Sequence, residues 1–595
     1  MASSSRGLSS AEYQRLLTED DDTSSHSLAD RDPVQRSRIS PRTPMQKQMA
    51  LQAALKVDPG VTRFSWAAMQ MYLVTLVICC CSGDSGFDGT VMGGINSMKQ
   101  FQDYFGMSGV GGETSIVFGI YTVGSICGTT PASYLPDRSG RRFSMFFGNA
   151  ILIIGALITA NAQGKGMFLG GRFLTGLGGT CSGASAKSYL AEIAPAHSRG
   201  AYLGFLNSFY YVGQMAATGL MVSTGRWESE MSWRLPLYIQ AIPAIINVSF
   251  IFLCPESPRW LYSIGKAHQA RQIIAKFHSS NNDINSPLVE VEMREIEDKI
   301  EVDGVLKKWW DYRALFATRA DRYRAYMVIL IGSFGQLSGN GLVTYFLPIL
   351  LKNAGIISQD RRLTLNFVNS ITSYMGGKSF TDFLSKHHDT LYQTYLNLPN
   401  SITGKIFRTF SSSKDRGPNH LIVSQGSATV DRYGRRKILL LATSVMVVLL
   451  AIVTGLLSSI GSAARANAGI TFIYLFMVVY SFGWTPMQAL YPAEVLSYEA
   501  RAKGLAFLGI VAQGASLINT FGLPIALQSL GWKVYLIFLI WDVVEVFLIH
   551  LFVVETKGLT LEEINEVFED PNPRAYSERL QKETEEARER GERLE

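Results

Sequence analysis

The chain has 595 residues, of which 47% are hydrophobic and 17% are charged, and its net charge is +6. Soluble proteins carry about 25% charged residues, whereas the charges here are gathered into a few stretches between long apolar segments. This distribution excludes a soluble multidomain protein, a disulfide scaffold and a nucleic-acid-binding protein, because the six cysteines lie in apolar segments and the basic residues lie in loops.

Residues 1–62 are polar and rich in Ser, Arg and Asp, and no apolar core lies near Met1. We therefore expect a disordered cytoplasmic tail and not a cleaved signal peptide. Glu12 and the pair Leu16-Leu17 fit an acidic-dileucine sorting motif, through which trafficking machinery would bind the tail. A chance match in a polar tail explains these residues equally well.

Apolar segments follow in two groups of six, and a helix that spans a bilayer needs about 20 such residues. We expect a first six-helix bundle at 63–254, a cytoplasmic linker with short helices at 255–324, a second bundle at 325–554 and a cytoplasmic tail at 555–595. The predicted spans are 66–93, 114–135, 143–162, 167–190, 201–222, 235–254, 325–351, 363–376, 438–460, 469–491, 505–528 and 533–554. The sequence thus predicts an all-α membrane protein.

Basic residues in the loops predict how the spans are oriented. Arg141 and Arg142 follow the second span, Arg199 follows the fourth, and Arg435 and Arg436 precede the ninth. The loops after spans 1, 3 and 9 are poorer in Lys and Arg. The positive-inside rule therefore places both tails and the linker in the cytoplasm.

Loop motifs occur twice, at matching places in the two halves. Residues 137–142 and 431–436 share the pattern Asp-Arg-X-Gly-Arg-Arg. Because acids and arginines at helix ends can pair when the inner mouth is shut and separate when it opens, we predict a cytoplasmic gate between two related halves. The predicted gate residues are Asp137, Arg138, Arg141, Arg142, Glu192, Arg199, Glu256 and Arg259 in the first half, and Asp431, Arg432, Arg435, Arg436, Glu494, Arg501 and Glu555 in the second.

With these motifs the chain resembles the sugar porters of the major facilitator superfamily, over residues 60–570 apart from one interruption. The resemblance also rests on Gly86-Phe87-Asp88-Gly89, Gly171-Arg172-Phe173, Trp233-Arg234-Leu235-Pro236, Pro255–Leu261 and Glu555–Glu563. Residues 338–341 and 524–527 are similar to fungal members labelled lactose-permease-like or hexose transporters.

The resemblance implies the major facilitator fold, with twelve transmembrane helices in two pseudo-symmetric six-helix bundles. It also implies transport of a sugar, a hexose or a disaccharide such as a galactoside, by alternating access with proton symport at the plasma membrane. The expected partners are the sugar, the proton and the lipid bilayer, with no nucleic acid, no cofactor, no metal and no enzymatic reaction. The alternatives are a nontransporting sugar sensor on the same fold and a carrier for a polyol or another polar organic solute.

Asp88 lies inside the first span, where a carboxylate is costly and therefore a functional candidate. Arg172 at the start of the fourth span is its natural partner. In the family that the chain resembles, an aspartate and an arginine at these positions form the proton-coupling pair. A permanent ion pair that holds spans 1 and 4 together is the structural alternative. Asp84 lies one turn earlier and fits a vestibule position better than a second proton site.

Sugar recognition needs amide and hydroxyl groups together with aromatic rings. The resemblance assigns sugar contact to Gln214 in span 5 and Gln336 in span 7, with helix packing as the alternative for each. The weaker candidates for substrate binding are Asn340, Tyr345, Phe346, Trp484 and Asn519. Gly335, Gly341 and Ala489 stand where the family usually has glutamine, asparagine and tryptophan, so the sugar is not specified.

Residues 377–425 interrupt span 8 with a polar stretch that would emerge in the middle of the membrane, where unpaired polar groups are prohibitive. We predict a retained intron or a gene-model error, because Gly377-Lys378-Ser379 can be encoded across a splice donor and Gln425 across an acceptor. Removing the stretch joins Gly376 to Gly426 and restores a nearly full span. A genuine insertion that loops out is the alternative.

Overall fold

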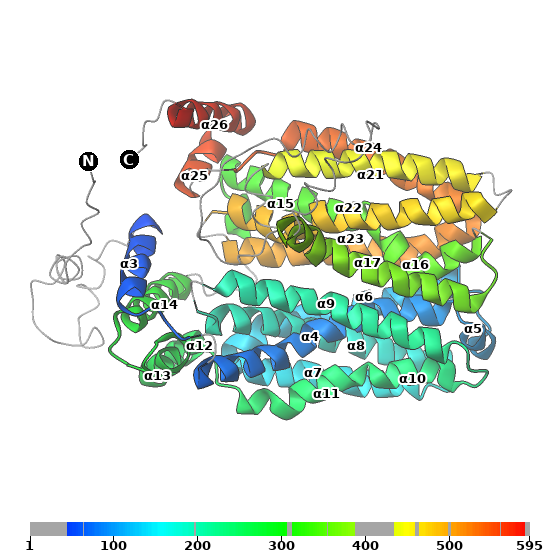
Figure 1. Ribbon diagram of the computed structural model, residues 1–595, viewed down its shortest axis with the longest axis horizontal. Coiled ribbons are helices and arrows are strands. Elements are labelled where there is room, and N and C mark those ends of the chain that lie inside the picture. Colours follow the sequence, from blue (N-terminus) through cyan, green and yellow to red (C-terminus); the bar gives the residue numbers. More distant parts are fainter. Residues whose placement is uncertain are drawn as a thin grey trace, which may run out of the picture. The chain divides into compact units, whose positions relative to one another are not determined.

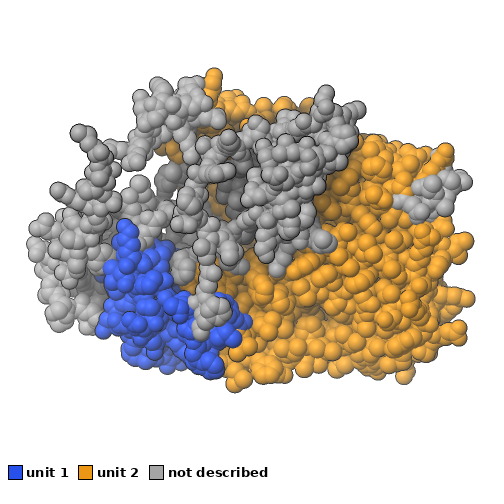
Figure 2. Space-filling model, in the orientation of Figure 1, with its two compact units in different colours: residues 1–72, 257–307 blue, residues 73–256, 308–595 orange. Residues whose placement is uncertain are grey.

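The computed structural model describes residues 44–62, 65–195, 198–305, 312–353, 355–386, 434–458, 463–497, 501–557, 559 and 561–589. Contacts divide the chain into two compact units (Figure 2). The first unit is residues 1–72 with 257–307, and the second is residues 73–256 with 308–595.

Long helical segments match the predicted spans, and the described residues contain no strand (Figure 1). The first six segments are α4 (Trp66–Asn96), α6 (Gly112–Ser139), α7 (Arg141–Ala160), α8 (Lys165–Ile193), α9 (Arg199–Thr224) and α10 (Met231–Ile239) continued by α11 (Ala241–Phe250). The last six are α15 (Arg319–Leu337) continued by α16 (Asn340–Asn353), α17 (Gln359–Lys386), α21 (Arg435–Ser458), α22 (Ala463–Val495), α23 (Arg501–Leu530) and α24 (Val534–Phe552). Shorter helices are α5 (Lys99–Phe105), α25 (Leu561–Glu569) and α26 (Pro573–Glu589).

Length and hydropathy alone identify seven segments of the described residues that could cross a membrane. They are Trp66–Asn96, Arg141–Ala160, Met231–Leu253, Arg319–Lys352, Arg435–Ser458, Ala468–Val495 and Lys503–Phe552. The last of these covers two helices, α23 and α24. Helices α6, α8 and α9 are also long, but their Gly, Ser and Thr residues lower their mean hydropathy.

Span 8 differs from its predicted extent. Helix α17 continues through position 377 and ends at Lys386, whereas the predicted span ended at 376. The remainder of the predicted interruption, 387–425, lies outside the described residues.

Glycines fix the starts of two helices that carry the repeated motif. Gly140 and Gly434 precede α7 and α21 with φ angles of +90° and +93°, a region that favours glycine. A Cβ atom at Gly434 would also lie 2.4 Å from Oε2 of Glu555. The glycine of the Asp-Arg-X-Gly-Arg-Arg pattern therefore serves the same turn in both halves.

Helices α4 and α9 touch through their backbones. A Cβ atom at Gly86 would lie 1.8 Å from the carbonyl oxygen of Tyr210, and one at Gly213 would lie 1.8 Å from that of Gly83. Any larger residue at these positions would push the helices apart, as expected where small residues line helix contacts in lipid.

The two bundles meet mainly where α6 packs against α23 and α9 against α17. Ser115 donates a hydrogen bond to the carbonyl oxygen of Phe521 at 2.7 Å, and Arg226 pairs with Asp360 at 2.7 Å. These contacts lie near the loops 97–111, 225–230 and 354–358, which we call the loop end. The other end of the bundles carries Arg141 and Arg435, and we call it the arginine end.

The first unit is built on α3 (Pro44–Val57), α12 (Pro258–Ser263), α13 (Ala267–His278) and α14 (Pro287–Val305). Helix α3 differs from the predicted disordered tail. It packs against α14, and Asp58 at its end accepts hydrogen bonds from the Ser286 hydroxyl at 2.6 Å and the Ser280 amide at 3.0 Å. These partners lie more than 200 residues away in sequence, so composition alone did not reveal them.

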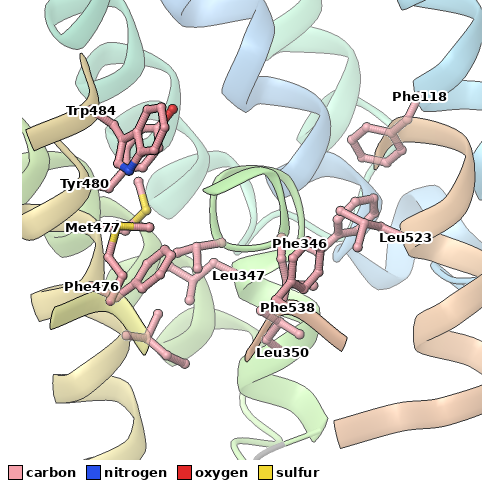
Figure 3. Packing of buried hydrophobic residues seen from close by; sticks show 14 of the residues in the cluster. Phe118, Phe346, Leu347, Leu350, Phe476, Met477, Tyr480, Trp484, Leu523 and Phe538 are labelled. Carbon is pink, nitrogen blue, oxygen red and sulfur yellow. The ribbon is translucent and has the colours of Figure 1, made fainter. Parts of the chain in front are cut away.

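A large hydrophobic cluster fills the interior of the second unit. Figure 3 shows Phe346 and Leu350 of α16 near Phe538 of α24, with Tyr480 and Trp484 on α22.

Candidate functional site

Asp88 on α4 and Arg172 on α8 form a buried ion pair. Their exposed fractions are 2% and 3%, and the ring centre of Tyr121 lies 4.6 Å from the Arg172 guanidinium carbon. The two residues of the predicted pair thus lie in contact, and the Nε–H group of Arg172 makes no hydrogen bond to the described residues.

Asp84 lies one turn before Asp88 and is also buried, with 1% exposed. Its Oδ1 atom has no hydrogen-bond partner among the residues that the structure describes. Two carboxyl groups therefore share this face of α4, and only Asp88 is seen with a cation.

Gln214 on α9 is buried and follows Gly213, the point where α9 touches α4. The Thr218 hydroxyl donates to the backbone carbonyl of Gln214 at 2.8 Å, and this bond does not use the Gln214 side chain. The α4–α9 crossing therefore sets Gln214 beside the helix that carries Asp88.

The seventh span breaks between α15 and α16 at Ser338-Gly339, where Gly339 has a φ angle of +86°. The Asn519 amide on α23 donates to the backbone carbonyl of Gln336 just before the break. Just after it, the Thr344 hydroxyl donates to Oδ1 of Asn340 at 2.9 Å. Three predicted residues, from two different parts of the chain, thus meet at one helix break.

Phe346 and Trp484 have no exposed surface in this conformation. The centre of the Phe346 ring lies 4.8 Å from that of Phe118. The indole N–H of Trp484 donates to the Thr443 hydroxyl at 3.1 Å. Both side chains therefore pack helices together and offer nothing to a solute here. Tyr345 is only partly buried.

At the arginine end, the first bundle carries a network of one arginine and two glutamates. Arg141 on α7 pairs with Glu192 on α8, with Nε 2.9 Å from Oε2. Glu256 accepts hydrogen bonds from the backbone amides of Arg141 and Arg142 at 3.2 and 3.4 Å. The network ties α7, α8 and the chain after α11 into one cluster.

The second bundle repeats this network. Arg435 on α21 pairs with Glu494 on α22 at 2.7 Å, and Glu555 accepts from the backbone amides of Arg435 and Arg436 at 2.8 and 3.1 Å. Among the described residues, each network lies within a single bundle. We call the two networks the clamps.

Of the other predicted gate residues, Asp137 joins the first clamp, and the rest contact other groups or lie outside the described residues. Asp137 is mostly exposed and 3.3 Å from Arg141, Arg138 contacts Tyr134, and Arg259 pairs with Glu295 at 3.4 Å within the first unit. Arg199 begins α9, and its Nε atom is buried without a hydrogen-bond partner among the described residues. Asp431, Arg432 and the side chain of Arg501 lie outside the described residues.

Sequence reasoning missed a second repeated contact. Tyr189 donates to the Pro255 carbonyl, and Tyr491 donates to the Val554 carbonyl at 2.9 Å. Each tyrosine lies three residues before a clamp glutamate. The recurrence of a tyrosine at this spacing in both halves was the signal that could have identified them.

Sequence reasoning also missed two acids in α24, Asp542 and Glu545. Both are fully buried, and neither oxygen of Asp542 has a hydrogen-bond partner in the described part of the chain. The Trp541 indole N–H donates to Glu545 at 2.5 Å. Two carboxyl groups three residues apart inside an apolar span were the available signal.

A family profile described as "Sugar (and other) transporter" matches residues 74–376 and 419–568. The unmatched stretch, 377–418, falls within the predicted interruption. Groups of three or more His, Cys, Asp or Glu side chains placed to hold a metal ion are absent from the described residues.

Similar proteins span most of the chain. The "Probable metabolite transport protein CsbC" of Bacillus subtilis is 28% identical over 76% of this chain and 85% of its own length. The "High-affinity glucose transporter" of Kluyveromyces lactis is 24% identical over 84% of this chain and 86% of its own.

Among solved structures, the inward open conformation of the xylose transporter XylE from E. coli superposes with a TM-score of 0.63 and 18% identity. The superposition covers 83% of this chain and 99% of the XylE chain. The structure of the proton:xylose symporter XylE bound to 6-bromo-6-deoxy-D-glucose gives a TM-score of 0.60 at 19% identity, covering 84% of this chain and all of that one. The predicted major facilitator fold is confirmed.

Proposed function

The chain belongs to the sugar transporter family of the major facilitator superfamily, and from this premise we propose that it carries a sugar together with a proton by alternating access. The observation that carries the proposal is the buried Asp88–Arg172 pair between α4 and α8. A carboxylate and a guanidinium inside the membrane are costly and mark an ion or proton pathway. The names of its relatives, which include glucose and sugar transporters, support a sugar as the solute.

Asp88 would be the proton site. Protonation neutralises the carboxylate and removes its attraction for Arg172, so the free energies of the two bundle arrangements change relative to each other. The Tyr121 ring beside the guanidinium would hold the released Arg172 by a cation–π contact. Binding of a proton from one side of the membrane would thus favour the arrangement in which the site faces the other side.

The distribution of contacts supports alternating access. Hydrogen bonds and an ion pair join the bundles at the loop end, while at the arginine end the clamp contacts among the described residues join helices of one bundle. This arrangement fits a state that is closed at the loop end. By the positive-inside rule, the basic loops favour the cytoplasm for the arginine end and for both tails. The plasma membrane would be the location.

Substrate contact would come from Gln214 in the first bundle and from Gln336, Asn340 and Asn519 at the helix break in the second. Amide and hydroxyl groups can each donate to or accept from sugar hydroxyls. Discontinuous helices near the midplane are the usual setting of such sites. The carrier would perform no covalent chemistry and need no cofactor besides the proton gradient.

Uptake measurements test the proposal. The full chain, expressed in transporter-deficient yeast cells, is given radiolabelled D-glucose, D-galactose, D-xylose, lactose and glycerol, each with and without a protonophore. We expect accumulation of at least one sugar and its loss with the protonophore. Accumulation of glycerol alone would favour a polyol carrier, and a chain at the cell surface without uptake of any solute would contradict transport.

A further inference from the structure

Two glycines flank the break in the seventh span, and an amide side chain from another helix lies against each. A Cβ atom at Gly335 would lie 2.2 Å from Nε2 and 2.6 Å from Cδ of Gln488 on α22. A Cβ atom at Gly341 would lie 3.3 Å from Nδ2 of Asn519 on α23. Amides from α22 and α23 therefore occupy the space that side chains on α15 and α16 would take.

Gln488 is held in this position by hydrogen bonds from one end of its amide only. Nε2 donates to the Tyr480 hydroxyl at 2.8 Å and to the Gly335 carbonyl at 3.2 Å, and the Tyr480 hydroxyl donates to the same carbonyl at 2.6 Å. The hydrogen bonds among the described residues do not use Oε1, and Gln488 is only partly buried. The acceptor end of the amide is therefore available to a hydroxyl group.

The break explains why the carbonyls here attract amides. Helix α15 ends at Leu337, so the carbonyls of Gly335 and Gln336 are among its last four and have no partner within the helix. Gln488 binds the first and Asn519 binds the second. Capping alone would fill these roles, but capping does not need the free acceptor that Gln488 retains.

The helix that follows the break touches the helix that carries Asp88. A Cβ atom at Gly93 of α4 would lie 2.5 Å from the carbonyl oxygen of Tyr345 on α16, the helix that continues from the break. Gly93 is five residues from Asp88 on the same helix. A solute held at the break would therefore lie close to α4, the helix that carries the proposed proton site, Asp88.

We propose that Gln488 is a substrate-binding residue, which supplies from α22 the hydroxyl-binding amide that Gly335 cannot supply from α15. Its Oε1 accepts a hydrogen bond from a hydroxyl of a polyhydroxylated solute, beside Asn519. The site rests on the proposed function of sugar transport. It places the specificity of the second bundle on α22 and α23 in addition to the seventh span.

Moving the amide back tests the assignment. Initial rates of uptake of the five radiolabelled solutes are measured for the full chain, for Gln488→Ala and for the double variants Gly335→Gln/Gln488→Ala and Gly335→Ala/Gln488→Ala. For the best-transported solute, we expect Gln488→Ala to raise KM at least tenfold while kcat stays within threefold. Added to Gln488→Ala, the substitution Gly335→Gln should return KM to within threefold of the full chain, and Gly335→Ala should not.

Gln528→Ala is the matched control, because Gln528 also packs its amide against a glycine, Gly111, but far from the break. Its KM should not change. The inference is overturned if Gln488→Ala leaves KM unchanged, or if both double variants restore KM equally, since restoration by alanine means packing. Absence of uptake of every solute by the full chain would overturn the proposed function itself and this site with it.

Discussion

Arg435 donates three hydrogen bonds to Glu494: Nε reaches both carboxylate oxygens, at 3.2 and 3.0 Å, and Nη2 reaches Oε1 at 2.7 Å. This pair joins α21 to α22 inside the second bundle, as Arg141 joins α7 to α8 inside the first. Because the clamp contacts among the described residues join helices of one bundle, they can keep that bundle rigid while the two bundles separate. This relationship suggests rigid-body rocking of two preserved halves.

Removal of the Glu494 charge should destabilise the second bundle. In Glu494→Gln the mostly buried Arg435 loses its ion pair with Glu494, which we expect to cost about 2 kcal/mol. The melting temperature in detergent should fall by about 5 °C, and Glu192→Gln should behave alike. Glu228→Gln, at an exposed loop position, is the control. Equal melting temperatures for all three variants would contradict a stabilising clamp.

Loss of the titratable group at Asp88 should uncouple transport from the proton gradient. Asp88→Asn is close to isosteric with the protonated acid, so the bundles can still rearrange but no proton is released or bound. We expect accumulation against a gradient to disappear and exchange of labelled for unlabelled solute to persist, as measured in vesicles with an imposed pH gradient. Undiminished uphill uptake by the variant would disprove the coupling role.

Acid should release helix α3 in the first unit. Burial alone would raise the pKa of Asp58, but hydrogen bonds from Ser286, Ser280 and Gly60 outweigh it and hold the pKa well below its usual value. A lowered pKa stabilises the folded state above the ordinary aspartate value of about 3.9, and this contribution is lost as pH falls below that value.

Hydrogen exchange of residues 44–57, corrected for the intrinsic rate at each pH, measures this effect. We expect protection at pH 7 that declines below about pH 4. In Asp58→Asn, protection should already be lowered at pH 7, by about 30-fold for a loss of about 2 kcal/mol. Asp283→Asn changes an acid in the nearby loop whose carboxylate accepts a hydrogen bond from the Asn285 amide and, among the described residues, none from α3, so α3 should stay protected. Equal protection of α3 in both variants would refute the stabilisation of α3 by the Asp58 hydrogen bonds.

Removal of residues 377–425 should raise the amount of the protein at the cell surface and its rate of transport. The family profile skips 377–418, and joining Gly376 to Gly426 leaves span 8 without the polar stretch. We expect the shortened chain to reach the cell surface in greater amount and to transport at least twice as fast per cell as the full chain. A transcript that contains the whole stretch, together with lower uptake by the shortened chain, would establish a genuine insertion.

The sequence by itself was sufficient for the spans other than the extent of span 8, for the internal repeat and for the Asp88–Arg172 pair. Each depends on local chemistry: apolar runs of membrane length, charged loops, and carboxylate and guanidinium groups too costly to lie in lipid without a purpose. The clamp residues Arg141, Glu192, Arg435 and Glu494 were recognisable for the same reason, because their motif occurs twice.

Only the tertiary structure decided which groups meet. The described contacts of each clamp lie within its own bundle, and Phe346 and Trp484 point into packed core. Asp58 binds a loop beyond the sixth span, and Gln488 fills the space beside Gly335. These facts depend on how each helix is rotated about its axis and how closely its neighbours approach. Such rotation is set by side chains that lie far apart in the sequence, which a linear pattern of residues does not specify.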